Sequence, residues 1–209
     1  MTEQSMHWDA AVYARHSEAQ FGWARETIAK LGLQGHEHLI DLGCGDGKVS
    51  AYLADRLPTG AVLGIDNSQE MIDLAGRTFP PSRCPNLTFQ YMDVCNIDVR
   101  RRFDIAFSNA VLHWVKDHRP VLAGVRQCLK PGGRVLFQMG GKGNAQEIGL
   151  ALLEIISRPP WQPYFTELSI PFRFFDFVIQ FDIEVSKSGI VLSYPLLFFA
   201  GFPCVNLVN

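Results

Sequence analysis

The sequence predicts an α/β fold in which an open, mostly parallel sheet carries helices on both faces. Five short segments have the pattern of strands, and they are HLIDL (38–42), AVLGID (61–66), LTFQYM (87–92), FDIAFS (103–108) and RVLFQM (134–139). The first two read as buried apolar runs, and LTFQYM alternates between apolar and polar residues. Segments with helical periodicity separate them, and Gly and Pro residues mark the turns. Strands that alternate with helices in this way are typical of a doubly wound sheet.

A long helix is predicted before the first strand, over residues 9–31. One face carries Phe21, Ala24, Ile28 and Leu31, which favours packing on the sheet. A second face gathers Tyr13, Ser17, Gln20 and Trp23 at spacings of three or four, so these side chains can face one object. Packing on the sheet alone is the other interpretation of this helix.

The later helices are marked by their ends. Ser68 is placed to cap the helix that follows AVLGID. The apolar positions of residues 121–129 outline another helix, which we expect Pro131-Gly132-Gly133 to end. Asn144 followed by Glu147 is a variant of the capping box and predicts a helix through Ile156.

The first predicted strand leads directly into a glycine-rich loop, DLGCGDG (41–47), with Gly43, Gly45 and Gly47 at alternate positions. Glycine lets a backbone approach a ligand closely because it has no Cβ. The dinucleotide-binding fingerprint requires a third Gly where Lys48 stands, and the phosphate-binding loop requires Ser or Thr where Val49 stands. What remains is an acidic residue followed by Gly-x-Gly-x-Gly.

Polar side chains stand at or just after the ends of four predicted strands, and they are Asp41, Asp66, Asp93 and Asn109. The carboxyl ends of parallel strands share one edge of the sheet, and ligands bind there where the strand order reverses. A carboxylate such as Asp66 can accept hydrogen bonds from both hydroxyls of a ribose. The pattern therefore predicts a nucleoside site on a Rossmann-like sheet. A role in a turn or cap is the alternative for Asp66 and Asp93.

The loop resembles the first motif of the class I S-adenosylmethionine-dependent methyltransferases. Further segments are similar to small-molecule carboxyl O-methyltransferases, a group that includes the trans-aconitate and juvenile hormone acid methyltransferases. The similar segments are WDAAVYARHSEAQFGWA (8–24), GIDNS (64–68), MDV (92–94), SNAVLHWV (108–115) and LKPGGRVLF (129–137), within residues 8–170.

The resemblance implies S-adenosylmethionine as the cofactor and assigns roles to named residues. Asp66 would hold the ribose, Asp93 the adenine amino group, and the backbones of Gly43 and Gly45 the amino-acid moiety. The Asn109 carbonyl would lie near the ammonium group. The wider set of expected cofactor contacts is Asp41, Cys44, Asn67, Met71 and Val94, with a core role as the alternative for Met71. Gln20 and Trp114 match positions that the family associates with carboxylate binding and catalysis.

The chemistry predicted is methyl transfer to the oxygen of a small carboxylic acid. Such an acceptor is ionised at pH 7 and needs no general base, so positioning supplies much of the rate. The alternatives are a hydroxyl, amine or protein acceptor with His113 as base, and a donor-binding protein with impaired turnover. The missing third glycine argues against a nicotinamide oxidoreductase.

Composition narrows the class of protein. The length of 209 residues fits one domain, and a net charge of −2 provides no broad basic surface for nucleic acid. The five cysteines form no CxxC pair and no cluster with metal-site spacing, so no metal is expected. Free thiols and a polar N-terminal segment without signal-peptide features lead us to expect a cytoplasmic protein. The sequence does not predict an oligomeric state.

The last part of the chain differs from the rest. We expect residues 1–170 to form the cofactor-binding domain and residues 171–209 to be an atypical, aromatic-rich segment. FVIQFDIEVS and IVLSYPLLFF flank Lys187-Ser188-Gly189, which predicts an antiparallel hairpin closing the sheet. A truncated lid is one alternative. A membrane-inserting tail is another, although Pro195 and Pro203 argue against it and no membrane partner is expected.

Overall fold

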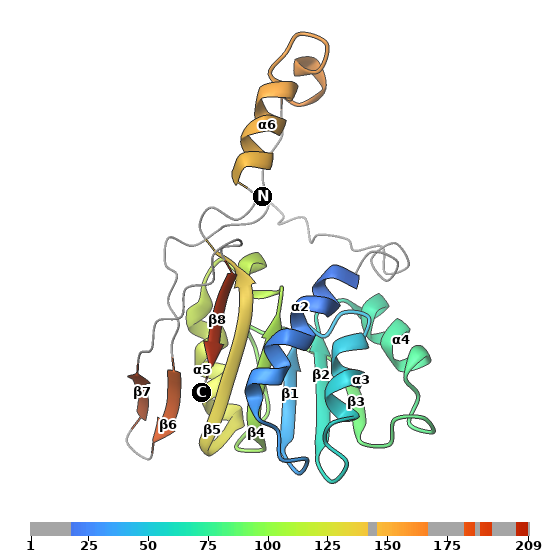
Figure 1. Ribbon diagram of the computed structural model, residues 1–209, viewed down its shortest axis with the longest axis vertical. Coiled ribbons are helices and arrows are strands. Elements are labelled where there is room, and N and C mark those ends of the chain that lie inside the picture. Colours follow the sequence, from blue (N-terminus) through green and yellow to red (C-terminus); the bar gives the residue numbers. More distant parts are fainter. Residues whose placement is uncertain (1–17, 142–145, 167–181, 187–188, 194–203, 209) are drawn as a thin grey trace.

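The computed structural model describes residues 18–141, 146–166, 182–186, 189–193 and 204–208 (Figure 1). Its α-helices are α2 (Glu18–Ile28), α3 (Lys48–Ala54), α4 (Gln69–Thr78), α5 (His118–Cys128) and α6 (Gln146–Ile156). Short 3₁₀ turns are η1 (Ala29–Leu31), η2 (Leu112–Trp114) and η3 (Gln162–Tyr164). The strands are β1 (His38–Leu42), β2 (Ala61–Asp66), β3 (Leu87–Tyr91), β4 (Phe103–Asn109), β5 (Leu129–Gly140), β6 (Asp182–Ser186), β7 (Gly189–Ser193) and β8 (Cys204–Val208).

Six of these strands form one sheet in the order β3-β2-β1-β4-β5-β8. The first five are parallel to their neighbours, and β8 pairs antiparallel with β5. The predicted α/β class, with its mostly parallel sheet, is confirmed. The strand order reverses between β1 and β4, so the residues that follow these two strands flank the position where such sheets bind ligands.

Two hydrophobic clusters fill the two sides of the sheet. Successive residues of β1 alternate between them, because Leu39 belongs to the cluster with Ala24, Ile28 and Leu53, whereas Ile40 belongs to the other. Helices α2 and α3 therefore cover one face and α5 covers the other (Figure 1). Each large apolar side chain buried in these clusters contributes about 1.5–3 kcal/mol. Of the predicted sheet-facing residues of the first helix, Ala24, Ile28 and Leu31 are core residues. Phe21 is half-buried and contacts the ring of Tyr52 edge-on.

One element prediction needs correction, and two others lie partly outside the described residues. Helix α5 ends at Cys128, three residues earlier than Pro131, and Pro131-Gly132-Gly133 lies within β5. Cys128 packs in the core and Leu129 is already extended, so the chain leaves the helix before the proline is reached. Residues 9–17 of the predicted first helix and Asn144 of the predicted capping box lie outside the described residues.

The C-terminal hairpin forms, but it does not close the sheet. Strands β6 and β7 pair antiparallel with Ser186 opposite Gly189, and they make a separate two-stranded sheet. The place beside β5 is taken by β8, whose Val208 pairs with Leu136. Within the described part of the chain, no helix has the length and apolar character needed to cross a membrane.

Helix α6 stands away from the sheet in Figure 1. Its large apolar side chains are mostly exposed, and they are Ile148, Leu150, Leu152, Leu153 and Ile155. Neither hydrophobic cluster includes a residue of this helix.

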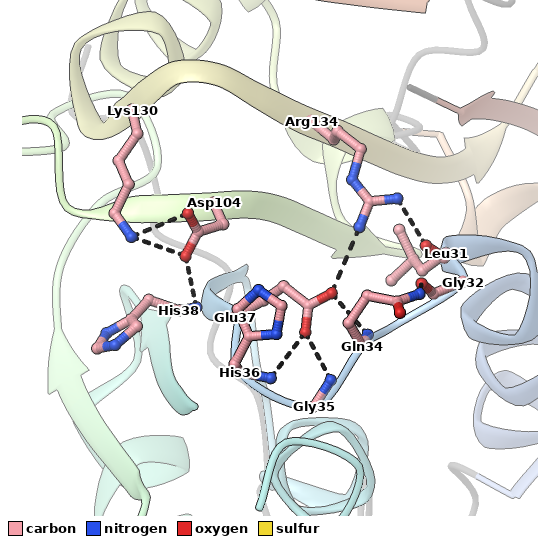
Figure 2. Close-up of polar contacts among 10 residues, drawn as sticks. All are labelled: Leu31, Gly32, Gln34, Gly35, His36, Glu37, His38, Asp104, Lys130 and Arg134. Carbon is pink, nitrogen blue, oxygen red and sulfur yellow. Dashed lines mark hydrogen bonds and ion pairs between the residues drawn. The ribbon is translucent and has the colours of Figure 1, made fainter. Parts of the chain in front are cut away.

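A polar network fastens the end of α2 to the amino end of the sheet (Figure 2). The carboxylate of Glu37 accepts hydrogen bonds from the backbone amides of Gln34, Gly35 and His36 at 2.8–3.1 Å. Arg134 of β5 donates to the Leu31 carbonyl at 2.7 Å and lies 3.7 Å from Glu37. The network fixes the direction of α2, so that its first turn lies toward the carboxyl ends of the strands.

We expect Glu37→Gln to lower the free energy of unfolding by about 2–3 kcal/mol at pH 7, because the amide cannot replace both carboxylate oxygens. Burial alone would raise the pKa of Glu37, but the backbone amides outweigh it and the pKa lies below its ordinary value. A lowered carboxylate pKa means that this stabilisation is present above the unfolded pKa and is lost as the pH falls through the folded one. Urea denaturation at pH 7 and pH 3 should show the variant converging on wild type in acid.

The matched control is Glu154→Gln, which removes an exposed ion pair with Arg158 within α6. Such a pair contributes well under 1 kcal/mol. If both variants cost the same at pH 7, the network at the amino end of the sheet does not have the role described.

Candidate functional site

The loop between β1 and α3 crosses the carboxyl end of the sheet. Gly43, Gly45 and Gly47 all have positive φ angles, of 74°, 52° and 79°, which side chains rarely tolerate. The amides of Gly43 and Cys44 donate to the carbonyl of Ile65 at 2.8 and 2.9 Å, so the loop is held against the end of β2. Space is also restricted, because a Cβ on Gly43 would lie 2.3 Å from Cγ2 of Val111.

Asp66, the last residue of β2, is joined directly to this loop. Its Oδ2 accepts from the Gly45 amide at 3.0 Å and its Oδ1 accepts from the Ser68 amide at 2.9 Å. Burial raises the pKa of Asp66, against the opposing effect of these amides. An ionised carboxylate has about four lone-pair sites, so Asp66 keeps acceptor capacity for a further donor. The arrangement fits a ligand that presents two neighbouring hydroxyls.

Asp41 lies beneath the loop and is buried. Its Oδ2 accepts the hydroxyl of Ser50 in α3 at 2.6 Å. Burial raises its pKa to about 7, and the nearby charge of Asp66 adds to the rise. Burial raises the pKa of the Cys44 thiol well above its ordinary value, and the negative charges of Asp41 and Asp66 raise it further. This cysteine therefore stays protonated at neutral pH. Contacts of Asp41 or Cys44 with a cofactor stay predictions.

The other residues expected to contact a cofactor differ in exposure. Asp93 is exposed, and its Oδ1 accepts from the Cys95 amide at 2.8 Å in the turn after β3. Asn67 is exposed beside Asp66. Met71 and Val94 are buried, and Val94 belongs to the core cluster on the α5 side of the sheet. The interpretation of Met71 as a core residue is thus supported by its burial.

The segment after β4 approaches the glycine loop from the other side of the strand-order reversal. Asn109 ends β4, and Ala110 has a φ of 58°, an uncommon angle for a residue with a side chain. Val111 then packs on Gly43, and η2 follows with His113 and Trp114. The two rings lie 5.0 Å apart between centroids and are tilted by 43°. Burial lowers the pKa of His113, so its imidazole is neutral at pH 7.

Helix α2 is linked to the same region by Thr27, which contacts Gln138 of β5, and the sequence indicated neither residue. The Thr27 hydroxyl donates to the side-chain carbonyl of Gln138 in β5. The backbone carbonyl of Gln138 accepts from the Ala110 amide at 2.7 Å. Gln20 lies in the first turn of α2, two turns before Thr27, and its role stays a prediction.

Comparison with known proteins identifies the family. Residues 39–133 match a family model described as a methyltransferase domain. Over 135 residues, the chain is 34% identical to the trans-aconitate 2-methyltransferase of Acidovorax ebreus, covering 64% of this chain and 50% of that protein. The chain is also 27% identical to a protein of Invertebrate iridescent virus 6 named methyltransferase 235L. That match covers 88% of this chain and 66% of the viral protein. Residues 39–133 therefore form a methyltransferase domain of the class I S-adenosylmethionine-dependent kind.

Solved structures of methyltransferases share the fold of this chain. The match to a methyltransferase from Aquifex aeolicus covers 71% of this chain and 88% of the Aquifex chain, with 18% identity and a TM-score of 0.59. The match to geranyl diphosphate methyltransferase in complex with GPP and sinefungin covers 61% of this chain and 47% of that one, with 20% identity and a TM-score of 0.53. The chain spans between half and two thirds of the length of the curated relatives described above.

The residues at the carboxyl end of the sheet fit S-adenosylmethionine, the cofactor of the class I methyltransferases. The glycines of the loop present backbone without side chains, and Asp66 has acceptor capacity left for a further donor. The loop follows β1 at the strand-order reversal, and Asp66 ends the neighbouring strand β2. The sequence alone could indicate Gly43, Gly45 and Asp66 because their spacing is regular. It could not indicate Val111 or Gln138, whose importance arises from contacts between distant segments.

Proposed function

We propose that this methyltransferase transfers the methyl group of S-adenosylmethionine to the oxygen of a small carboxylic acid. The observation that carries the proposal is the direct contact between the glycine loop and the segment with Trp114. Val111 packs against Gly43 of the loop expected to hold the donor. The turn η2 begins at the next residue, Leu112, and so lies beside that loop. The similarity to trans-aconitate 2-methyltransferases supports an acid as the acceptor.

The donor side of the proposed site follows from the loop geometry. Asp66 would accept the two ribose hydroxyls on its remaining lone pairs, and Asp93 would accept from the adenine amino group. The backbone of Gly43 and Gly45 would lie along the amino-acid moiety. S-adenosylmethionine supplies an electrophilic methyl group on a sulfonium. The ring of Trp114 can stabilise a nearby cation by about 0.5–2 kcal/mol.

The acceptor side requires orientation more than proton transfer. A carboxylate is ionised at pH 7 and is itself the nucleophile, so the chain need only hold one of its oxygens in line with the methyl group. Trp114 can donate one hydrogen bond through its indole N–H, and Gln20 can donate through its amide. The second candidate function uses His113 as a base for a hydroxyl or amine acceptor. Its neutral imidazole favours this alternative.

The pH dependence of kcat/KM for the acceptor, measured at saturating donor, distinguishes the two schemes. With a carboxylate acceptor we expect a flat profile from about pH 6 to 8. A histidine base must be neutral to act, so the rate would instead rise as the pH increases through the His113 pKa, which lies below 6.5. Gln20→Ala should reduce kcat/KM by roughly ten- to a hundredfold, the effect of one hydrogen bond to a charged group.

The matched comparison is His113→Ala against Gln20→Ala, with product formation from isotope-labelled donor followed by mass spectrometry. A panel of small di- and tricarboxylic acids should be methylated, while matched amines and alcohols should not. If His113→Ala loses orders of magnitude and Gln20→Ala remains near wild type, the base-assisted scheme replaces the carboxylate scheme. If the donor binds and no acceptor is turned over, the chain is a donor-binding protein with impaired turnover.

A further inference from the structure

The 3₁₀ turn η2, which carries His113 and Trp114, is fixed to the rest of the protein at three points. The Ala110 amide just before it donates to Gln138 of β5 at 2.7 Å. Val111 packs on Gly43. The third point is the carbonyl of Leu112, which accepts from the Val115 amide at 3.1 Å and lies 2.7 Å from Nε2 of His118. The first two points fix where the turn begins, and the third fixes its orientation toward α5.

His118 is mounted on a rigid element. It is the first residue of α5, and the side chain of Asp117 caps that helix by accepting from the Arg119 amide at 3.0 Å. Val121, Val125 and Cys128 hold the helix in the core. A carbonyl oxygen can only accept a hydrogen bond, so Nε2 of His118 carries the hydrogen and donates to Leu112. The imidazole therefore connects the turn to a helix whose inner face is packed in the core.

Removal of the hydrogen bond from His118 to Leu112 should leave the turn η2 in place and change its orientation. The Val115 amide still closes the turn, and the Leu112 side chain is anchored because it is buried in the core cluster. The carbonyl of Leu112 would lose its link to α5, and the two residues that follow it would gain freedom. The contacts of Asp66 and of the glycine loop do not involve His118.

We propose that His118 is a positioning residue for methyl transfer, acting through the Leu112 carbonyl to set the orientation of His113 and Trp114. The inference rests on the proposed function in placing the acceptor beside this turn. The environment of Trp114 distinguishes this role from a role in stabilising the start of α5, because a residue that only stabilises the helix would leave that environment unchanged.

The test compares His118→Leu, which cannot donate, with His118→Gln, whose amide nitrogen can occupy the position of Nε2. We expect His118→Leu to lower kcat about tenfold and to leave the Kd for S-adenosylhomocysteine within twofold of wild type. His118→Gln should restore most of the rate. The fluorescence of Trp114, obtained by subtracting the spectrum of the matching Trp114→Phe protein, should shift and become more quenchable by acrylamide in the Leu variant only.

Several outcomes would overturn the inference. One is a His118→Leu protein with unchanged kcat and unchanged Trp114 emission. Another is an equal loss of activity and thermal stability in the Leu and Gln variants, which would indicate a role in folding alone. Absence of wild-type turnover on carboxylic acids would instead contradict the proposed function. In that case the emission and quenching of Trp114 in the Leu and Gln variants still decide whether His118 positions the turn.

Discussion

Replacing Asp66 by alanine is expected to weaken binding of S-adenosylhomocysteine by a hundredfold or more. Each hydrogen bond from a ribose hydroxyl to this carboxylate is charge-assisted and contributes on the order of 1.5–3 kcal/mol, and two are expected. The substitution also releases the amides of Gly45 and Ser68, which the carboxylate holds at 3.0 and 2.9 Å. Isothermal titration calorimetry measures the affinity directly.

A ligand without one ribose hydroxyl separates these two effects. If Asp66 contacts the ribose, the 2′-deoxy analogue should bind wild type more weakly than S-adenosylhomocysteine, and the Asp66→Ala variant should not distinguish the two ligands. If the carboxylate only holds the loop, both proteins should discriminate equally. Asp73→Ala is the matched control, because Asp73 is exposed on α4 and hydrogen bonds with Gln69 of its own helix.

The fold was predictable from sequence because its strongest signals are local. The runs that became β1, β2, β3 and β4 are short and apolar, and Ser68 caps α4 as its position suggested, accepting from the Met71 amide. The start of β5 was not predictable, because Pro131-Gly132-Gly133 ordinarily ends a structural element and here lies within a strand. Pairing with β4 shifts register between Phe103 and Ile105, which accommodates this irregular segment.

The geometry of the glycine loop was predictable because its signal is local to the strand, loop and helix that form it. The positions of Gly43, Gly45 and Asp66 follow from strand–loop–helix spacing, and the structure joins Gly45 to Asp66 directly. The contact of Val111 with Gly43 joins residues from two strands, and no local pattern indicates which apolar residue will meet the glycine. For the same reason, the link through Gln138 became visible only when the sheet order placed β4 and β5 side by side.

Asp41 shows how the site affects stability as well as binding. A carboxylate is costly to bury, and Ser50 supplies its hydrogen bond at 2.6 Å. Burial raises the pKa of Asp41 from 3.8 to about 7. The hydrogen bond from Ser50 opposes this rise, and the charge of Asp66 adds to it. A folded-state pKa above the unfolded value means that the folded protein binds more protons between these two pH values. Its stability therefore falls as the pH rises through this range.

Asp41→Asn is accordingly expected to stabilise the protein at pH 8 by on the order of 3 kcal/mol, because the amide keeps the shape and avoids a buried charge. The difference in unfolding free energy between variant and wild type, from urea denaturation, should be near zero at pH 4, increase up to about pH 7 and then remain constant. Ser50→Ala provides the opposing case: without the hydroxyl, the ionised carboxylate loses a donor, so destabilisation should be greater at pH 8 than at pH 5. A difference for Asp41→Asn that does not change with pH would show that Asp41 titrates at its ordinary pKa and that its burial imposes no charge penalty.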